Sequence, residues 1–337
     1  MHTLYAGPFI QDRRTFLAGL TAAGTAGLIG TSAPAWAEPP PETTTIRLPA
    51  VPAACMAPLY LAKDLLLGEG FAEVHYVPTP IISVGMVANG EIDVSLEACV
   101  DFLPLVDVGR PLTILSGVHV GCMELRAKDS IKSIGDLRGT RVGVSAIGAA
   151  DHLLVSAMAS YVGVDPGVDI KWVTNSSVSQ ADLFTAGEID AFIGAPPEPS
   201  QPCMRNVGHV VVNTADDRPW SNYFCCMVTA NADFVSRNPV ATKRMLRAIL
   251  KATDICHTQS EMVARRMADV GFSPECALTI LKDARYGSWR EYDPEDTVRF
   301  FTLRLSEVRM IKKTPKDVIS KFTDWRFLDE LRREMKT

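Results

Sequence analysis

The sequence lacks the marks of several common protein classes. Although it contains 8 cysteines and 6 histidines, it has no C-x-x-C pair and no His/Cys group with zinc spacing, so we expect no metal ion and no cofactor. The formal net charge is −5 and the basic residues are scattered, which argues against nucleic-acid binding because that function needs a basic patch. Beyond residue 37, no apolar run reaches the length of a membrane-spanning helix.

Motifs of hydrolytic enzymes are missing as well. Neither G-x-S-x-G nor H-E-x-x-H occurs in the chain, and no Ser/His/Asp spacing suggests a catalytic triad. We therefore expect a protein that is not an enzyme.

The first 37 residues have the composition of an export signal. Arg13 and Arg14 precede the uncharged apolar stretch AGLTAAGTAGLIGTSA, and an Ala-x-Ala site ends at Ala37. This order predicts an exported protein that is cleaved after Ala37. The arginine pair followed by Thr-Phe-Leu resembles a twin-arginine signal, and a general secretory signal is the alternative. Residues 38–45 are rich in Pro and Thr, which predicts a disordered lead-in. We expect the mature protein in the periplasm.

The tetrapeptide GEID occurs twice, at 90–93 and 187–190. Each copy stands between a helix-like segment and a short apolar strand, within a regular alternation of strands and helices. Such alternation predicts α/β architecture with parallel sheets. The repeat predicts two similar lobes, residues 46–120 plus 219–337 and residues 121–218, instead of one continuous sheet.

Four stretches, taken in order, resemble the periplasmic solute-binding proteins of ABC importers, in the branch that includes nitrate-, taurine-, alkanesulfonate- and thiamin-pyrimidine-binding proteins. They are APLYLAKDLLLGEGF, GEIDVSLEA, SIGDLRGTRVGV and GEIDAFIGAPPE. The resemblance extends over about 46–337. It implies a type II two-lobed periplasmic-binding-protein clamp, each lobe a sheet flanked by helices, with hinges near 118–125 and 220–228. It also implies a monomer that captures a small organic solute and delivers it to a membrane permease.

Ligands of open α/β sheets bind beyond the carboxyl ends of the strands, which selects four loops and the returning segment. In the family that this sequence resembles, the ligand-binding cleft is lined by the residues immediately before the PLY sequence. The candidate ligand-binding residues are Cys55, Met56, Ala57, Glu97, Cys99, Ser145, Gly148, His152, Pro197, Glu198, Trp220 and Tyr223.

Each candidate has a defined role and a structural alternative. Ser145 and Gly148 would let the backbone N–H groups of a helix N-terminus approach an anionic group, and His152 would donate or accept a hydrogen bond. Core packing is the alternative for Trp220. These loops contain carboxylates and no Arg or Lys, which favours an organic solute, nitrogen-containing or aromatic, over a small inorganic anion.

Three further questions stay open at this point. The stretch NYFCCM is faintly similar to the Cys-rich region of the fungal thiamin-pyrimidine synthase, an enzyme of related fold. A ligand-sensing clamp without transport is also compatible with the sequence. An oxidising compartment permits disulfides, and Cys256 and Cys276 could link neighbouring helices, whereas buried free thiols are the alternative.

Overall fold

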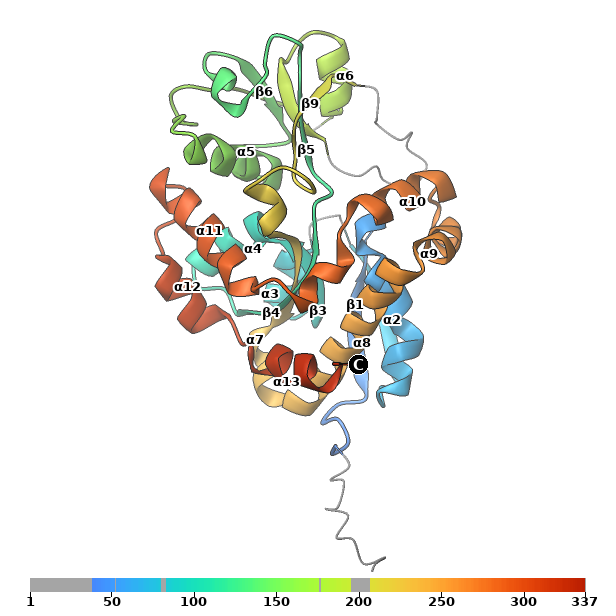
Figure 1. Ribbon diagram of the computed structural model, residues 1–337. Helices are drawn as coiled ribbons and strands as arrows, with labels where there is room; N and C mark the ends of the chain where they lie inside the picture. The colour runs from blue at the N-terminus through green and yellow to red at the C-terminus, as the bar shows by residue number, and fades with distance from the viewer. Residues whose placement is uncertain (1–37, 52, 80–82, 176, 195–206, 337) are drawn as a thin grey trace, which may run out of the picture. The chain divides into compact units, whose positions relative to one another are not determined.

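Ten strands in the described part of the chain form three sheets (Figure 1). The structure, a computed structural model, describes residues 38–51, 53–79, 83–175, 177–194 and 207–336. The strands are β1 (Thr45–Ala50), β2 (Glu73–Pro78), β3 (Val94–Ala98), β4 (Leu112–Val120), β5 (Glu124–Ala127), β6 (Arg141–Val144), β7 (Lys171–Thr174), β8 (Ala191–Gly194), β9 (His209–Asn213) and β10 (Phe224–Asn231).

Strands β1 and β2 pair in parallel, and helices α2 (Ala57–Gly68) and α8 (Pro239–Thr258) pack together beside them (Figure 1). The buried residues of α2 include Leu59, Ala62 and Leu66, whose spacing of three and four places them on one helical face. The helix ends at Gly68. Glu69, which follows, lies within 2.6 Å of the Arg247 guanidinium on α8, so the ion pair joins the two helices.

Strand β10 lies between β3 and β4 and runs antiparallel to both. The alternation of strands and helices predicted parallel sheets, and here that prediction is wrong. The reason is that β10 returns from the five-stranded sheet and enters from the opposite end. Alternation specifies only how consecutive strands are connected, so it gives no information about a strand inserted from far along the chain.

The five-stranded sheet has the order β7-β6-β8-β5-β9. Strands β7, β6 and β8 are parallel, as predicted, whereas β5 is antiparallel to β8 and β9. Helices α5 (Ala150–Tyr161) and α6 (Gln180–Thr185) pack on this sheet. The chain reaches the sheet through residues 121–123 and leaves it through residues 214–223, which we call the two crossing segments.

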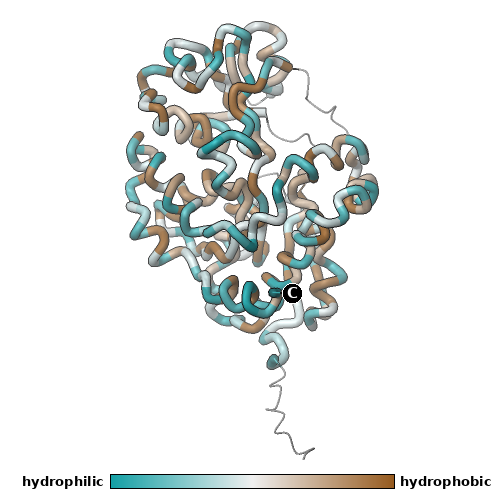
Figure 2. Tube along the Cα trace, in the orientation of Figure 1, coloured by the Kyte–Doolittle hydropathy of each residue, from teal (hydrophilic) through white to brown (hydrophobic). Residues whose placement is uncertain are grey.

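The remaining helices are mostly amphipathic. They are η1 (Ala54–Met56), α3 (Val84–Asn89), α4 (Cys99–Asp107), η2 (Ile134–Leu137), η3 (Trp220–Asn222), α7 (Ala232–Arg237), α9 (Ser260–Met267), η4 (Ala268–Val270), α10 (Pro274–Asp283), η5 (Tyr286–Arg290), α11 (Pro294–Glu307), α12 (Pro315–Phe322) and α13 (Arg326–Glu334). Hydrophobic and hydrophilic residues are interspersed along them (Figure 2). Within the described ranges, no helix has the length and apolar character needed to cross a membrane.

The two GEID copies form the same corner in different sheets. Asp93 accepts hydrogen bonds from the Arg47 backbone N–H at 2.7 Å and from Arg47 Nη2 at 2.5 Å. Asp190 accepts from the Arg141 backbone N–H at 2.9 Å and from Arg141 Nη2 at 2.7 Å. In both corners the aspartate N–H donates back to the arginine carbonyl. The repeated tetrapeptide therefore forms the same set of aspartate–arginine hydrogen bonds in two places.

Three further sequence expectations concern regions outside the sheets. The predicted export signal, residues 1–37, lies outside the described residues. Glu42, in the segment expected to be disordered, accepts hydrogen bonds from the Val240 and Ala241 N–H groups at 3.0 and 2.9 Å, which anchors it to the N-terminus of α8. Cys256 is a free thiol and Cys276 is disulfide-bonded, so these two cysteines are not bonded to each other.

Candidate functional site

A buried acidic group lies at the end of β3. Glu97 is buried and accepts a 2.6 Å hydrogen bond from Ser83 Oγ, which lies 2.7 Å from Ser95 Oγ. Burial, and after it the charge of the neighbouring Asp101, raises the pKa of Glu97 to about 8. The carboxyl group of Glu97 is therefore largely protonated at neutral pH.

Asp101 extends this group towards the five-stranded sheet. Its carboxylate accepts a 3.2 Å hydrogen bond from the Ala98 N–H at the start of α4. Burial, and after it the charges of Cys225 and Asp151, raises the pKa of Asp101 to about 7. Within the described ranges, neither Asp101 nor Glu97 forms an ion pair with Lys or Arg. Glu97 was predicted from the sequence, whereas Asp101, four residues further on in the first turn of α4, was not.

Sulfur and imidazole groups converge beside the acidic group. Cys55 follows β1, and its Sγ, a ring nitrogen of His119 and the Sγ of Cys122 all lie within 4.8 Å of one another. The Cys122 Sγ is 3.2 Å from the Cys225 Sγ. Hydrogen bonding from the Cys122 thiol, together with Cys226, lowers the pKa of Cys55 well below its usual range. Such a set of donors can hold a soft metal ion.

Met56 and Ala57, the predicted ligand-binding residues that follow Cys55, belong to the core. Met56 is 5% exposed and Ala57 is fully buried, and Ala57 begins α2. Tyr286 donates a 2.9 Å hydrogen bond to the Cys55 carbonyl, which fixes the backbone at this point. Of the three residues predicted here, only Cys55 has its reactive group in a polar cluster.

The loop before α5 is closed by its own side chains. Asp151 accepts hydrogen bonds from the Ser145 N–H at 2.6 Å and from Ser145 Oγ at 3.1 Å. The Gly148 N–H donates to His152 Nδ1 at 3.1 Å, and Gly148 adopts a φ of 86°, which favours glycine. The Ser145 and Gly148 N–H groups were predicted to bind a ligand anion. To do so, they would first have to break their hydrogen bonds to Asp151 and His152.

His152 is buried, and its ring packs edge-on against Trp172 with centroids 4.5 Å apart. Burial lowers the pKa of His152, which favours the neutral ring, and acceptance at Nδ1 leaves the proton on Nε2. The histidine thus has a structural role in shaping this loop.

Trp220 and Tyr223 pack in an aromatic cluster. Trp220 is 4% exposed and lies edge-on to Tyr161 and Phe300, with centroid distances of 5.5 and 5.7 Å. Tyr223 stacks on Phe300 at 4.1 Å. This arrangement matches the core-packing alternative for Trp220, because its ring faces protein on at least two sides.

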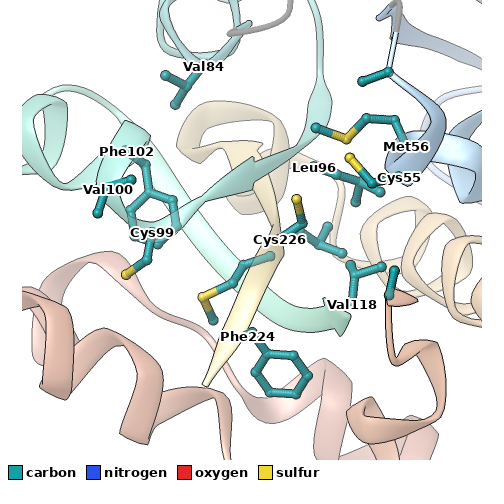
Figure 3. Close-up of a cluster of buried hydrophobic side chains, with 14 of the residues drawn as sticks. Cys55, Met56, Val84, Leu96, Cys99, Val100, Phe102, Val118, Phe224 and Cys226 are labelled. Carbon is teal, nitrogen blue, oxygen red and sulfur yellow. The ribbon is translucent and has the colours of Figure 1, made fainter. Parts of the chain in front are cut away.

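Of the remaining predicted residues that the structure describes, Cys99 does not join the acidic group. Cys99 is buried, and its Sγ points to the Thr297 carbonyl on α11 at 3.9 Å, on the opposite side from the sulfur of Cys226 (Figure 3). Pro197 and Glu198 lie outside the described residues. The sequence analysis also missed His119, Cys122 and Cys225. The spacing of His119 and Cys122, three residues apart, was the available signal.

Residues 70–262 match the family model described as "NMT1/THI5 like". The chain belongs to this family. A curated NMT1/THI5-like relative, the 4-amino-5-hydroxymethyl-2-methylpyrimidine phosphate synthase THI12 of Saccharomyces cerevisiae, is 24% identical over 220 residues. The match covers 58% of this chain and 62% of that protein, so this chain spans less than two thirds of the length of the curated relatives it matches.

Solved structures show which fold this NMT1/THI5-like chain adopts. The periplasmic nitrate-binding protein NrtA from Synechocystis PCC 6803 superposes with a TM-score of 0.71 at 16% identity, covering 88% of this chain and 90% of that chain. The alkanesulfonate-binding protein SsuA from Xanthomonas axonopodis pv. citri, bound to MOPS, gives 0.66 at 15% identity, covering 86% and 99%. The predicted resemblance and the predicted periplasmic-binding-protein fold are confirmed.

Proposed function

We propose that this protein is a periplasmic solute-binding protein. As a monomer, it captures a small organic solute between its two lobes and delivers it to an ABC-type permease in the membrane. The supporting observation is the similarity to a nitrate-binding and an alkanesulfonate-binding protein over most of the chain. In such clamps the solute stabilises the closed form through contacts that the open form lacks.

The acidic group favours a solute with a protonated nitrogen. Glu97, Asp101 and Asp151 come from both halves of the chain, and in the described part none of them pairs with Lys or Arg. The charge of Asp151 helps to raise the pKa of Asp101, and a cation beside Asp101 would oppose that shift. An inorganic anion would instead require cationic or multiple N–H donors, and Asp151 and His152 occupy two such N–H groups.

A binding screen tests this proposal. Thermal shifts of the exported protein are measured with organic amines, aminopyrimidines, alkanesulfonates and nitrate. We expect a nitrogenous cation to raise the melting temperature, because a ligand that binds only the folded state stabilises it increasingly as its concentration exceeds the dissociation constant. We expect Asp101→Asn to weaken the best ligand by about 10-fold or more, which corresponds to about 1.4 kcal/mol.

The matched control is Glu275→Gln, which removes a charge from an exposed site on α10 and should leave affinity unchanged. Binding of nitrate or sulfonates alone, or equal affinity in Asp101→Asn, would contradict the assignment of a cationic solute. Loss of uptake of the solute in a strain without this gene, but with its permease intact, would separate transport from sensing.

A second candidate function is catalysis, favoured by the relatives named as pyrimidine phosphate synthases. Mass spectrometry of the bound solute distinguishes the two. Recovery of unchanged solute after prolonged incubation supports binding alone. A product that accumulates with time would make the protein an enzyme.

A further inference from the structure

Donor atoms from three separate parts of the chain meet at the crossing segments. Cys55 comes from η1, His119 from the end of β4, Cys122 from the first crossing segment, and Cys225 from the start of β10. The distances of 4.8 Å or less among the first three, and of 3.2 Å between the Cys122 and Cys225 sulfurs, define one cluster. Figure 3 shows the sulfur of Cys226 directed towards that of Cys55.

Two adjacent cysteines reach this cluster because β10 is irregular. The pairing of β10 with β4 shifts register between Phe224 and Cys226 and again before Met227. Such a bulge re-aims side chains that would otherwise alternate between the two faces of a sheet. Cys226 stands opposite His119 in the register, while the Cys225 sulfur contacts Cys122.

His119 is the most informative member of the cluster. Its side chain is 0% exposed, and neither ring nitrogen has a hydrogen-bond partner among the residues the structure describes. Burying a polar group without a partner is costly. The ring lies 5.1 Å from that of Tyr286, and its nitrogen faces the thiols of Cys55 and Cys122. An imidazole held in this way is suited to coordinate an ion.

The backbone at Cys122 gives independent support. Cys122 has a φ of 77°, directly after Gly121 with a φ of 91°. Residues other than glycine rarely adopt this left-handed conformation and are disfavoured there. Glycine would fit the backbone better, so the thiol at this position suggests a use for the side chain.

We propose that Cys55, His119, Cys122 and Cys225 bind a thiophilic metal ion, either Zn²⁺ or Cu⁺, with the Cys226 thiol beside it. Thiolates and imidazole are the ligands that both ions prefer. In a tetrahedral zinc site, sulfurs about 2.3 Å from the metal lie about 3.8 Å apart. The observed separations, from 3.2 Å to at most 4.8 Å, bracket that value. The metal would join η1 to the first crossing segment and to the start of β10, which goes beyond the proposed capture of a solute.

Metal titration of the full chain with reduced thiols tests the proposal. Zn²⁺ and Cu⁺ are added in separate experiments against a chromophoric chelator, and the bound metal is counted by mass spectrometry. We expect about one ion per chain. Cys55→Ala and His119→Ala should weaken binding more than about 100-fold, because even the loss of an outer hydrogen bond costs up to that much.

Cys122→Gly is the decisive variant. Glycine suits the left-handed backbone, so this variant should melt at an equal or higher temperature without metal and yet lose metal binding. Cys99→Ala and Cys256→Ala are matched controls, since both thiols are free and buried and lie outside the cluster. No binding by the wild type, or equal losses in the two controls, would overturn the proposal. Recovery of Cys122 and Cys225 as a disulfide from the native compartment would do so as well.

Discussion

The Glu97 carboxyl lies beside serine hydroxyl groups. Among the described residues, no Lys or Arg forms an ion pair with it. Ser83 donates to it directly, and Ser95 lies behind Ser83. A carboxyl group in such a place is more easily kept protonated than ionised. Its pKa of about 8 in the folded protein exceeds the ordinary value of 4.5. Folding therefore favours the protonated form, and ionisation above neutral pH destabilises the native state.

Glu97→Gln should reveal this effect as a pH dependence. The folded pKa is raised, so the contribution of Glu97 to stability is fully present below pH 4.5 and is lost as the pH rises to about 8. Glutamine keeps the neutral form at all pH values. We expect the wild type to lose up to about 4 kcal/mol relative to Glu97→Gln across this range, measured by urea unfolding at several pH values. A stability difference that does not change with pH would contradict the assignment.

At the scale of elements, the two GEID corners show how one tetrapeptide motif positions a strand in each of two sheets. Each aspartate accepts hydrogen bonds from both the backbone N–H and the guanidinium of an arginine, Arg47 within β1 or Arg141 at the start of β6. Charge-assisted bonds of this kind are stronger than neutral ones. The corner thus fixes where β1 and β6 begin relative to β3 and β8.

Asp93→Asn and Asp190→Asn should each destabilise the protein by about 1–3 kcal/mol. The Asp93 side chain is 7% exposed and that of Asp190 is 21% exposed, so the first substitution should cost more. Bonding to Arg141 lowers the pKa of Asp190 below its usual range. Its contribution is therefore present above about pH 4 and is lost as the pH falls.

Chemical unfolding of both variants at neutral and acidic pH provides the measurement. A cost for Asp190→Asn that persists unchanged at low pH would contradict the role of its ionised form. No loss of stability in either variant would show that the repeated corner is dispensable.

For the whole molecule, much of the fold could be predicted because its signals are local. Helical spacing in α2, the GEID repeat and the ordered stretches each depend on nearby residues. The insertion of β10 between β3 and β4 could not be predicted in this way, since it joins residues more than one hundred positions apart. The metal-ligand cluster was missed for the same reason, because Cys55 and Cys225 meet only through tertiary structure.

The candidate site was predicted in part. Glu97, near the end of β3, and Cys55, in η1 after β1, both lie in polar clusters beyond strands, as the rule for open sheets suggests. Trp220 shows the limit of that rule. Its position beside a crossing segment suited a ligand contact, but a large aromatic ring gains more by burial against other rings.

The aromatic cluster connects α5 with α11. Tyr161 of α5 lies 6.0 Å from Phe300 of α11, and Trp220 contacts both. A double-mutant cycle of Tyr161→Ala and Phe300→Ala should give a coupling energy of about 0.5–1.5 kcal/mol in unfolding experiments. Strictly additive effects would contradict direct packing between these helices.

The same cluster makes Trp220 a natural fluorophore at the junction of α5, α11 and a crossing segment. Indole emission responds to the rings and polar groups around it, so any movement of α5 against α11 should alter its intensity or wavelength. Replacing Trp172, Trp289 and Trp325 by phenylalanine would leave one indole signal from the described chain. Solute capture could then be followed in real time, without any attached dye.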